Sequence, residues 1–180
     1  MGQVATSKTA AVINTGRWLQ AAMKILVKKP VDYTKDELNK FKDIVLLGGQ
    51  VQIKGLEDRI LNCKALAMCF INDELVGVSA IKKPNESKTK RTLEKAKLNN
   101  HLIPKFELGY SVTMKEHRGK GINSQLNDKL LSLMEKNESI YATTSVESMK
   151  AYLSKRGFVK VGESFEGAIN ETLEYFELKL

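Results

Sequence analysis

The sequence predicts an α+β fold, in which a mixed, mostly antiparallel central sheet is flanked by helices. Two β-rich apolar runs, 64–71 and 75–81, are joined by Asn72-Asp73-Glu74, which is a strong hairpin signal. The stretch 108–126 has the pattern of a strand, a glycine turn and a helix. The chain closes with two further strand-like runs that can pair antiparallel, at 158–161 and 173–180.

The other elements follow from local signals. Residues 33–47 predict a helix, because Thr34 and Glu37 have capping-box spacing and Gly48-Gly49 would end it. In chain order, the remaining expected elements are a strand at 50–53, a helix at 55–62, a polar helix at 87–98, a strand at 106–114, a helix at 119–136, a strand at 140–145 and a helix at 147–155.

Length and composition indicate one folded domain. The chain has 180 residues, 42% hydrophobic and 28% charged, which suits a globular protein with a single sizeable core. No apolar run is long enough to span a membrane. Cys63 and Cys69 make no disulfide framework and lie apart from His101 and His117, so we expect a reducing, cytoplasmic setting and no metal site.

The first acidic residue is Asp32, and the residues before it mix lysines with apolar side chains. This pattern predicts a basic amphipathic helical extension over 1–31, followed by the main domain over 32–180. A transit peptide or a membrane-surface helix would have the same pattern. We favour an extension packed on the domain or on a second subunit, and a homodimer is therefore one expectation.

The formal net charge of +8 favours an anionic ligand or partner. Lysines and one arginine gather in the stretch 82–97, where only Glu86 and Glu94 oppose them. This stretch has no aromatic residue on which bases could stack. A solvated helix face is thus favoured over a nucleic-acid contact.

The turn Arg118-Gly119-Lys120-Gly121 is the most informative feature of the chain. A glycine turn that opens a helix exposes free N–H groups at the positive end of the helix dipole. Glycine also allows the backbone to approach a phosphate closely. No Lys-Ser/Thr pair follows Gly121, and the three-glycine dinucleotide fingerprint is missing, so neither common nucleotide motif applies. The turn predicts a pyrophosphate ligand.

This turn resembles motif A of the GNAT-type N-acetyltransferases, Arg/Gln-x-x-Gly-x-Gly/Ala, with Asn123 in place of the last small residue. Met149-x-x-x-Leu153-x-x-x-Gly157-Phe158 is similar to a second segment of that family, and the resemblance covers 33–180. It implies the GNAT fold and acetyl-CoA as cofactor. The implied cofactor contacts are Val112, Thr113, Met114, Arg118, Gly119, Lys120, Gly121, Ile122, Asn123 and Ser124.

The resemblance implies transfer of an acetyl group from acetyl-CoA to a primary amine, by direct attack in a ternary complex. A backbone N–H in the stretch 112–114 would polarise the thioester carbonyl. The family often carries an acidic base on the strand before motif A, where this chain has Glu107. We expect partial burial to raise the pKa of Glu107 and suit it to proton abstraction. A solvent-facing Glu at the strand edge is the alternative.

Two positions depart from the family pattern. The usual tyrosine acid falls on Leu153, and a frequent asparagine falls on Val146. Tyr152 is a weak candidate acid, because one helical residue turns a side chain by about 100°. The helix-loop-helix segment of the family lines the acceptor groove, which makes Gln50 and Arg59 weak candidate substrate contacts.

Two other functions stay open at this point. The lost tyrosine and asparagine would also fit a GNAT-fold binding module with weak or no catalysis. The basic charge would also fit an acetyltransferase of the toxin type, which acts on charged tRNA.

Overall fold

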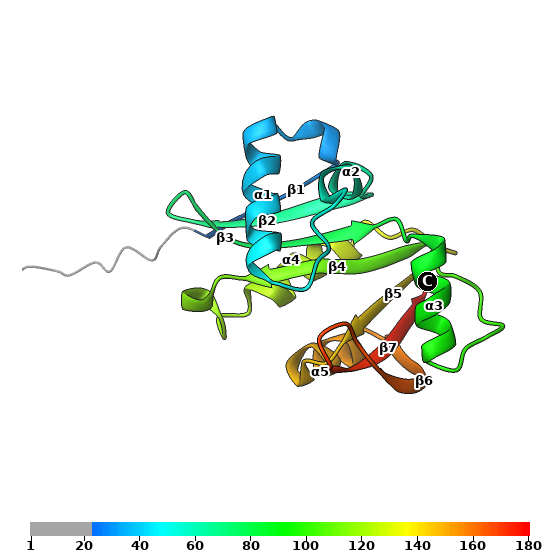
Figure 1. Cartoon of the computed structure of the whole chain (residues 1–180). Coiled ribbons are helices and arrows are strands. Elements are labelled where there is room, and N and C mark those ends of the chain that lie inside the picture. The colour runs from blue at the N-terminus through cyan, green and yellow to red at the C-terminus, as the bar shows by residue number, and fades with distance from the viewer. Residues whose placement is uncertain (1–22) are drawn as a thin grey trace, which may run out of the picture.

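A computed structural model describes residues 23–180, and within them the strands form one mixed sheet (Figure 1). The strand order is β1-β2-β3-β4-β5-β7-β6, and every neighbouring pair is antiparallel except β4–β5. The predicted fold class is therefore confirmed. The strands are β1 (Met23–Lys28), β2 (Ala65–Ile71), β3 (Glu74–Lys82), β4 (Phe106–Thr113), β5 (Ser139–Thr144), β6 (Val159–Glu166) and β7 (Thr172–Lys179).

Helices cover both faces of this sheet. The α-helices of the described residues are α1 (Lys35–Leu47), α2 (Leu56–Leu61), α3 (Glu86–Lys95), α4 (Ile122–Leu131) and α5 (Glu147–Lys155), and two short 3-10 helices lie at Pro30–Asp32 and Lys115–His117. Helices α1 and α2 pack on one face over β2 and β3, and α4 and α5 pack on the other. Helix α3 packs on β5 and β7 through Leu93 and Ala96. None of the described helices is long and apolar enough to cross a membrane.

Side-chain alternation along the strands decides which core each residue enters. On β2, Leu66 and Met68 enter the core under α1 and α2, whereas Ala65 and Ala67 enter the core under α4. The small alanines on the second face let α4 approach the sheet closely. The sheet is thus buried on both sides, as its long apolar runs require.

Strands β4 and β5 part soon after they meet. Their parallel pairing joins only Phe106 with Ile140 and Glu107 with Tyr141. Beyond Glu107 the two strands diverge toward the helices that follow them (Figure 1). The rest of β4 therefore has main-chain groups on its β5 side that the β4–β5 ladder does not pair.

A β-bulge lies in the divergent part of β4. Ala80 of β3 pairs with Gly109 and Val78 pairs with Val112, so two residues of β4 face Ser79 alone. One of these two, Tyr110, has a left-handed φ of 54°, a conformation that the first residue of one type of bulge adopts. The bulge lies at 110–111, just before the stretch 112–114 that was expected to polarise the thioester.

The predicted N-terminal helix is wrong for Met23–Lys28, which form edge strand β1 and pair antiparallel with β2. Ile25 and Val27 alternate toward the core, as β-branched side chains in a strand do. The sheet therefore begins before the predicted boundary at residue 32. The rest of the predicted extension, 1–22, lies outside the described residues.

Local signals placed most other elements correctly. The Thr34–Glu37 capping box is formed, and the hairpin turns at Asn72 and Asp73, both with positive φ. The predicted strand at 50–53 is wrong, because these residues form a loop. The helix predicted at 119–136 is shorter, Ile122–Leu131, and β6 is longer than predicted because a bulge continues it to Glu166.

Candidate active site

The glycine turn forms an open main-chain cradle at the start of α4. Gly119 and Gly121 have φ of 76° and 73°, which only glycine adopts without strain. Gly121 is the N-cap of α4, and no side chain caps it. The N–H groups of Ile122, Asn123 and Ser124 therefore have no intrahelical partner. Together they present several donors at the positive end of the helix dipole.

The cradle has room for an anion. A Cβ added at Gly119 or Gly121 would meet no heavy atom within 4 Å. Arg118 and Lys120 are exposed beside it, and Arg118 Nε donates to the Thr113 carbonyl at 3.1 Å, which ties the turn to the end of β4. Free donors, open space and two cations fit the pyrophosphate of coenzyme A.

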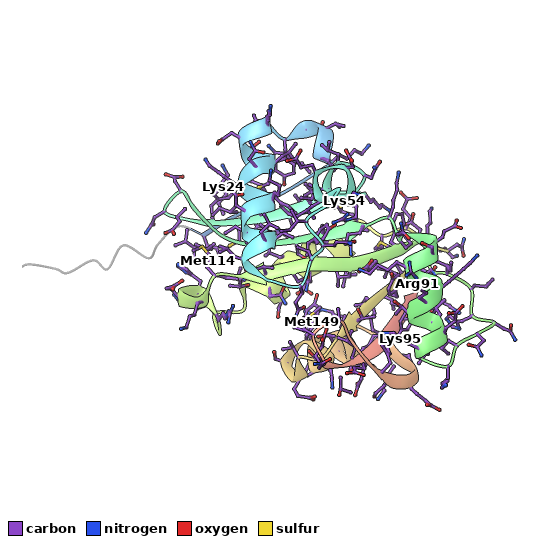
Figure 2. All side chains as sticks on the ribbon, in the orientation of Figure 1. Lys24, Lys54, Arg91, Lys95, Met114 and Met149 are labelled. Carbon is purple, nitrogen blue, oxygen red and sulfur yellow. The ribbon has the colours of Figure 1, made fainter. Side chains whose placement is uncertain are left out.

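Asn123, the departure from the family pattern, points away from this cradle. Its amide nitrogen lies 3.6 Å from the sulfur of Met149 on α5, and its oxygen accepts from Asn127 at 3.3 Å. Met149 projects from α5 in Figure 2. The larger side chain is therefore accommodated between α4 and α5, and it leaves the phosphate side of the turn open.

Of the three residues expected to polarise a thioester, Met114 is excluded as a donor. Its N–H donates to the Val76 carbonyl of β3 at 2.9 Å. Because successive N–H groups of a strand point to opposite sides, Val112 also directs its N–H to β3. Thr113 directs its N–H toward β5, where the β4–β5 ladder gives it no partner. Thr113 is therefore the candidate oxyanion donor of this stretch.

The end of β4 also lines a pocket of about 260 Å³. Leu47 at the end of α1 and Arg118 of the glycine turn also line it. Within the described residues, Thr113 Oγ1 of this lining and His117 Nδ1 in the segment that follows are buried polar atoms with no hydrogen-bond partner. Such atoms are uncommon in a folded protein unless a ligand or water meets them. They fit a polar ligand that follows β4 toward the cradle.

Glu107 lies on the α3 side of the sheet, at the point where β4 and β5 part. Its Oε1 accepts from Lys82 Nζ at 2.5 Å, and its Oε2 accepts from the Tyr141 hydroxyl at 3.1 Å. The Tyr141 hydroxyl also lies 3.0 Å from Thr89 Oγ1 of α3. Glu107 is thus a largely buried carboxylate with one hydrogen bond to each oxygen and a side chain that is 17% exposed, which contradicts the solvent-facing alternative.

The predicted direction of the Glu107 pKa is also wrong. Burial does raise the pKa of this carboxyl, as expected, and is the largest single influence on it. The charge and hydrogen bond of Lys82, with smaller contributions from Lys88 and Tyr141, together outweigh burial and lower the pKa below its ordinary value. Glu107 is therefore ionised at neutral pH.

We expect Lys82→Met to shift the acidic limb of the pH–rate profile to higher pH. Without the ammonium, burial becomes the dominant influence and raises the pKa of Glu107, so the carboxylate is lost at a higher pH. Lys82→Arg keeps the positive charge and should leave the limb in place. The measurement is kcat/KM against pH for wild type and both variants, and coincident profiles for wild type and Lys82→Met would contradict it.

Tyr152, the weak candidate acid, anchors α5 to α4. Its hydroxyl donates to Asp128 Oδ1 at 2.7 Å, and Arg156 donates to both oxygens of the same carboxylate. The ring lies in the core on the α4 side, away from the face that carries Glu107. Burial, together with Asp128, raises the pKa of Tyr152 well above its ordinary value. The contacts assign Tyr152 a packing role.

Tyr152→Phe should therefore lower the free energy of unfolding by about 1 kcal/mol, the usual loss for one hydrogen bond. Turnover should stay within about twofold of wild type, since the ring and the Arg156–Asp128 pair remain. Urea unfolding and steady-state rates measure the two effects. A large fall in kcat with unchanged stability would restore Tyr152 as an acid.

The two weak substrate candidates differ in the structure. Arg59 donates to the carbonyls of Gln52 and Lys54, so its guanidinium holds the loop between α1 and α2. The guanidinium of Arg59 thus already has hydrogen-bond partners within the loop. The substrate role of Arg59 stays a prediction that no contact supports. Gln50 is exposed in the same loop, which follows Leu47 of the pocket wall. Its substrate role also stays a prediction.

Sequence reasoning missed the groups that support Glu107 and the bulge. Lys82 pairs with Glu107 in the β3–β4 register, and only that register brings the two together. Opposite the bulge, Ser79 Oγ lies 2.8 Å from Ser111 Oγ and 2.7 Å from Asn127 Oδ1. Ser79 and Asn127 are fully buried, so this network fixes the bulge from the α4 side.

No protein-family model and no curated protein sequence matches the chain. Solved structures match it over most of its length. Escherichia coli ElaA has a TM-score of 0.67 at 14% identity, covering 88% of this chain and 100% of ElaA. An acyl-CoA N-acyltransferase from Pseudomonas aeruginosa has a TM-score of 0.64 at 16% identity, covering 87% of this chain and 99% of its own.

Naa50 of Arabidopsis thaliana, in complex with the bisubstrate analogue CoA-Ac-MVNAL, has a TM-score of 0.58 at 16% identity. That match covers 87% of this chain and 99% of Naa50. At such low identities these likenesses show the fold. The chain has the GNAT fold of the acyl-CoA N-acyltransferases, as its motif A turn and second segment predicted.

Proposed function

We propose that this protein is an N-acetyltransferase that moves an acetyl group from acetyl-CoA to a primary amine by direct attack in a ternary complex. The observation that carries the proposal is the open cradle at Gly119 and Gly121, which directly follows the bulged, unpaired end of β4. Acetyl-CoA has a thioester at one end and a pyrophosphate nearer the other. The unpaired edge of β4 can bind the thioester end while the cradle that follows it along the chain binds the pyrophosphate.

Each group then has a defined task. Arg118, Lys120 and the free N–H groups of the first turn of α4 bind the pyrophosphate. The Thr113 N–H donates to the developing oxyanion. Glu107 accepts the proton that the acceptor ammonium must lose before it can attack, directly or through a water molecule. Bound acetyl-CoA supplies the activated acyl group.

A protein acid for the leaving sulfur is not part of this proposal. Leu153 is buried in the core, and Tyr152 is bound to Asp128. A thiolate is a good leaving group and can take its proton from solvent. The rate should therefore depend on one ionised base rather than on a base and an acid.

A screen tests the proposal directly. The protein is incubated with acetyl-CoA and a panel of primary amines, and release of the free CoA thiol is followed. We expect thiol release that depends on the amine and is saturable in both substrates. Binding of acetyl-CoA without turnover on any amine would instead favour the binding-module alternative. That alternative is based on Leu153 and Val146, which replace the family's tyrosine and asparagine.

The basic residues of α3 support a second acceptor class, the amine of charged tRNA. Lys88, Lys90, Arg91 and Lys95 are exposed, and Arg91 and Lys95 are seen on α3 in Figure 2. Phosphate contacts release counterions, so tRNA affinity should fall steeply as salt rises. An affinity for tRNA that is weak and insensitive to salt would exclude this acceptor and leave small amines and protein lysines.

A further inference from the structure

Lys82 places an amine beside Glu107, on the same side of the sheet. It is the last residue of β3 and lies opposite Glu107 in the β3–β4 register. Its side chain is only 13% exposed, and Nζ lies 2.5 Å from Glu107 Oε1. The same nitrogen lies 4.7 Å from the centre of the Tyr110 ring, in the bulge. A mostly buried amine thus lies beside the carboxylate that is proposed to act as the base.

Gly109 allows this position. A Cβ built there would lie 3.0 Å from Lys82 Cδ and 3.2 Å from Nζ, so the lysine stem crosses β4 directly over the glycine. Gly109 is the residue at which the bulge begins, and it lies two residues after Glu107, the last β4 residue that pairs with β5. Lys82 Nζ therefore lies over β4 where that strand leaves β5, four residues before Thr113, the candidate oxyanion donor.

We propose that Lys82 is itself an acceptor, and that acetyl-CoA bound in the cradle acetylates its Nζ when no other amine is present. This inference rests on the proposed function. Three observations support it: the amine is next to a base, it lies over the unpaired part of β4, and Gly109 holds open the space that it occupies.

The transfer balances in atoms and charge. The Lys82 ammonium gives one proton to Glu107, and the neutral nitrogen forms a bond to the acetyl carbonyl carbon. The carbon–sulfur bond breaks, the nitrogen gives its second proton to solvent, and the CoA thiolate takes a proton from solvent. The products are an uncharged acetyl-lysine, a protonated Glu107 that returns its proton to solvent, and free CoA.

The reaction should stop after one event per chain. Acetylation removes the positive charge of Lys82 and with it the ion pair to Glu107. The neighbouring Lys83 is exposed and is not in contact with the base, so it provides a matched control for lysines that react chemically without the site.

The experiment incubates the full chain with isotopically labelled acetyl-CoA, without added amine, and maps the label by peptide mass spectrometry. Wild type and Lys83→Arg should gain one acetyl group on Lys82, and Lys82→Arg should gain none there. Glu107→Gln should slow the labelling at least about tenfold, since a general base is worth that much or more.

Two results would overturn the inference. Label spread over exposed lysines at the same rate in wild type and Gly121→Glu would mean unassisted chemistry. Turnover of added amines with Lys82 left unlabelled would refute acetylation of Lys82 and leave the proposed function intact. Calorimetry on the same samples separates the two proposals, because failure to bind acetyl-CoA would overturn both.

Discussion

Gly121→Glu should weaken acetyl-CoA binding by at least about 100-fold, which corresponds to about 3 kcal/mol. Gly121 is the N-cap of α4 and has a left-handed φ of 73°. A glutamate there brings a carboxylate to the free N–H groups that would otherwise hold the pyrophosphate. The added charge competes for those donors and repels the phosphates. Isothermal titration of acetyl-CoA into both proteins measures the effect.

The variant should still fold. A Cβ at this position meets no heavy atom within 4 Å, so the cost is backbone strain of about 1 to 2 kcal/mol. A negative charge at a helix N-terminus partly offsets that strain. A cooperative thermal unfolding transition like that of wild type would show that the variant is folded. Loss of acetyl-CoA binding would then be due to the change in the cradle and not to unfolding.

Gly55→Glu is the matched control. Gly55 is also a helix N-cap, of α2, and has a φ of 69°. The substitution imposes similar strain and the same change in charge away from the cradle. Acetyl-CoA affinity should stay within about twofold of wild type. If Gly121→Glu bound acetyl-CoA as tightly as Gly55→Glu does, the cofactor would have to be placed elsewhere in the fold.

The cradle could be predicted from sequence because its requirements are local. Positive φ at two closely spaced positions demands glycine, and the apolar spacing after Gly121 predicts a helix. The same local logic failed for Met23–Lys28. There the spacing of charges favoured a helix, whereas pairing with β2 decided the outcome. Edge-strand pairing is a tertiary interaction that local propensity does not report.

The environment of Glu107 could not be predicted for a related reason. Lys82 and Glu107 are separated by the whole of α3 and its flanking loops, and only the sheet register brings them into contact. The apolar neighbours of Glu107 predicted partial burial, and burial does raise the pKa, but the charge and hydrogen bond of Lys82, with Lys88 and Tyr141, together outweigh it. Tyr152 is a similar case, because its role depends on Asp128 of the packed helix α4.

Glu107→Gln should lower kcat/KM for the best amine by about 100- to 1,000-fold, within the usual range for loss of a general base. The amide keeps nearly the same shape but cannot accept a proton at neutral pH. Acetyl-CoA affinity should be unchanged, because the cradle lies at the other end of β4. Thiol release at saturating acetyl-CoA measures the rate, and calorimetry measures the affinity.

The pH dependence gives an independent test of this role. The pKa of Glu107 is lowered from its ordinary 4.5, so the carboxylate stays ionised down to more acidic pH than a free glutamate would. Between about pH 6 and 9, the wild-type rate should then rise only as the acceptor ammonium loses its proton. An inflection in this range whose pH stayed the same for amines of different pKa would belong to a group of the enzyme. It would indicate a base other than Glu107.

Glu138→Gln separates loss of the base from loss of a buried ion pair. Glu138 is also a buried carboxylate, bound by Lys64 at 2.5 Å and Lys105 at 2.8 Å, before β5. Both variants remove a negative charge of which at most a small part is exposed and leave lysine unpaired, so both should lose stability. Only Glu107→Gln should also lose turnover, measured at a temperature where both variants are folded. Equal rates in the two variants would mean that Glu107 serves the fold, and that proton transfer is carried out by solvent.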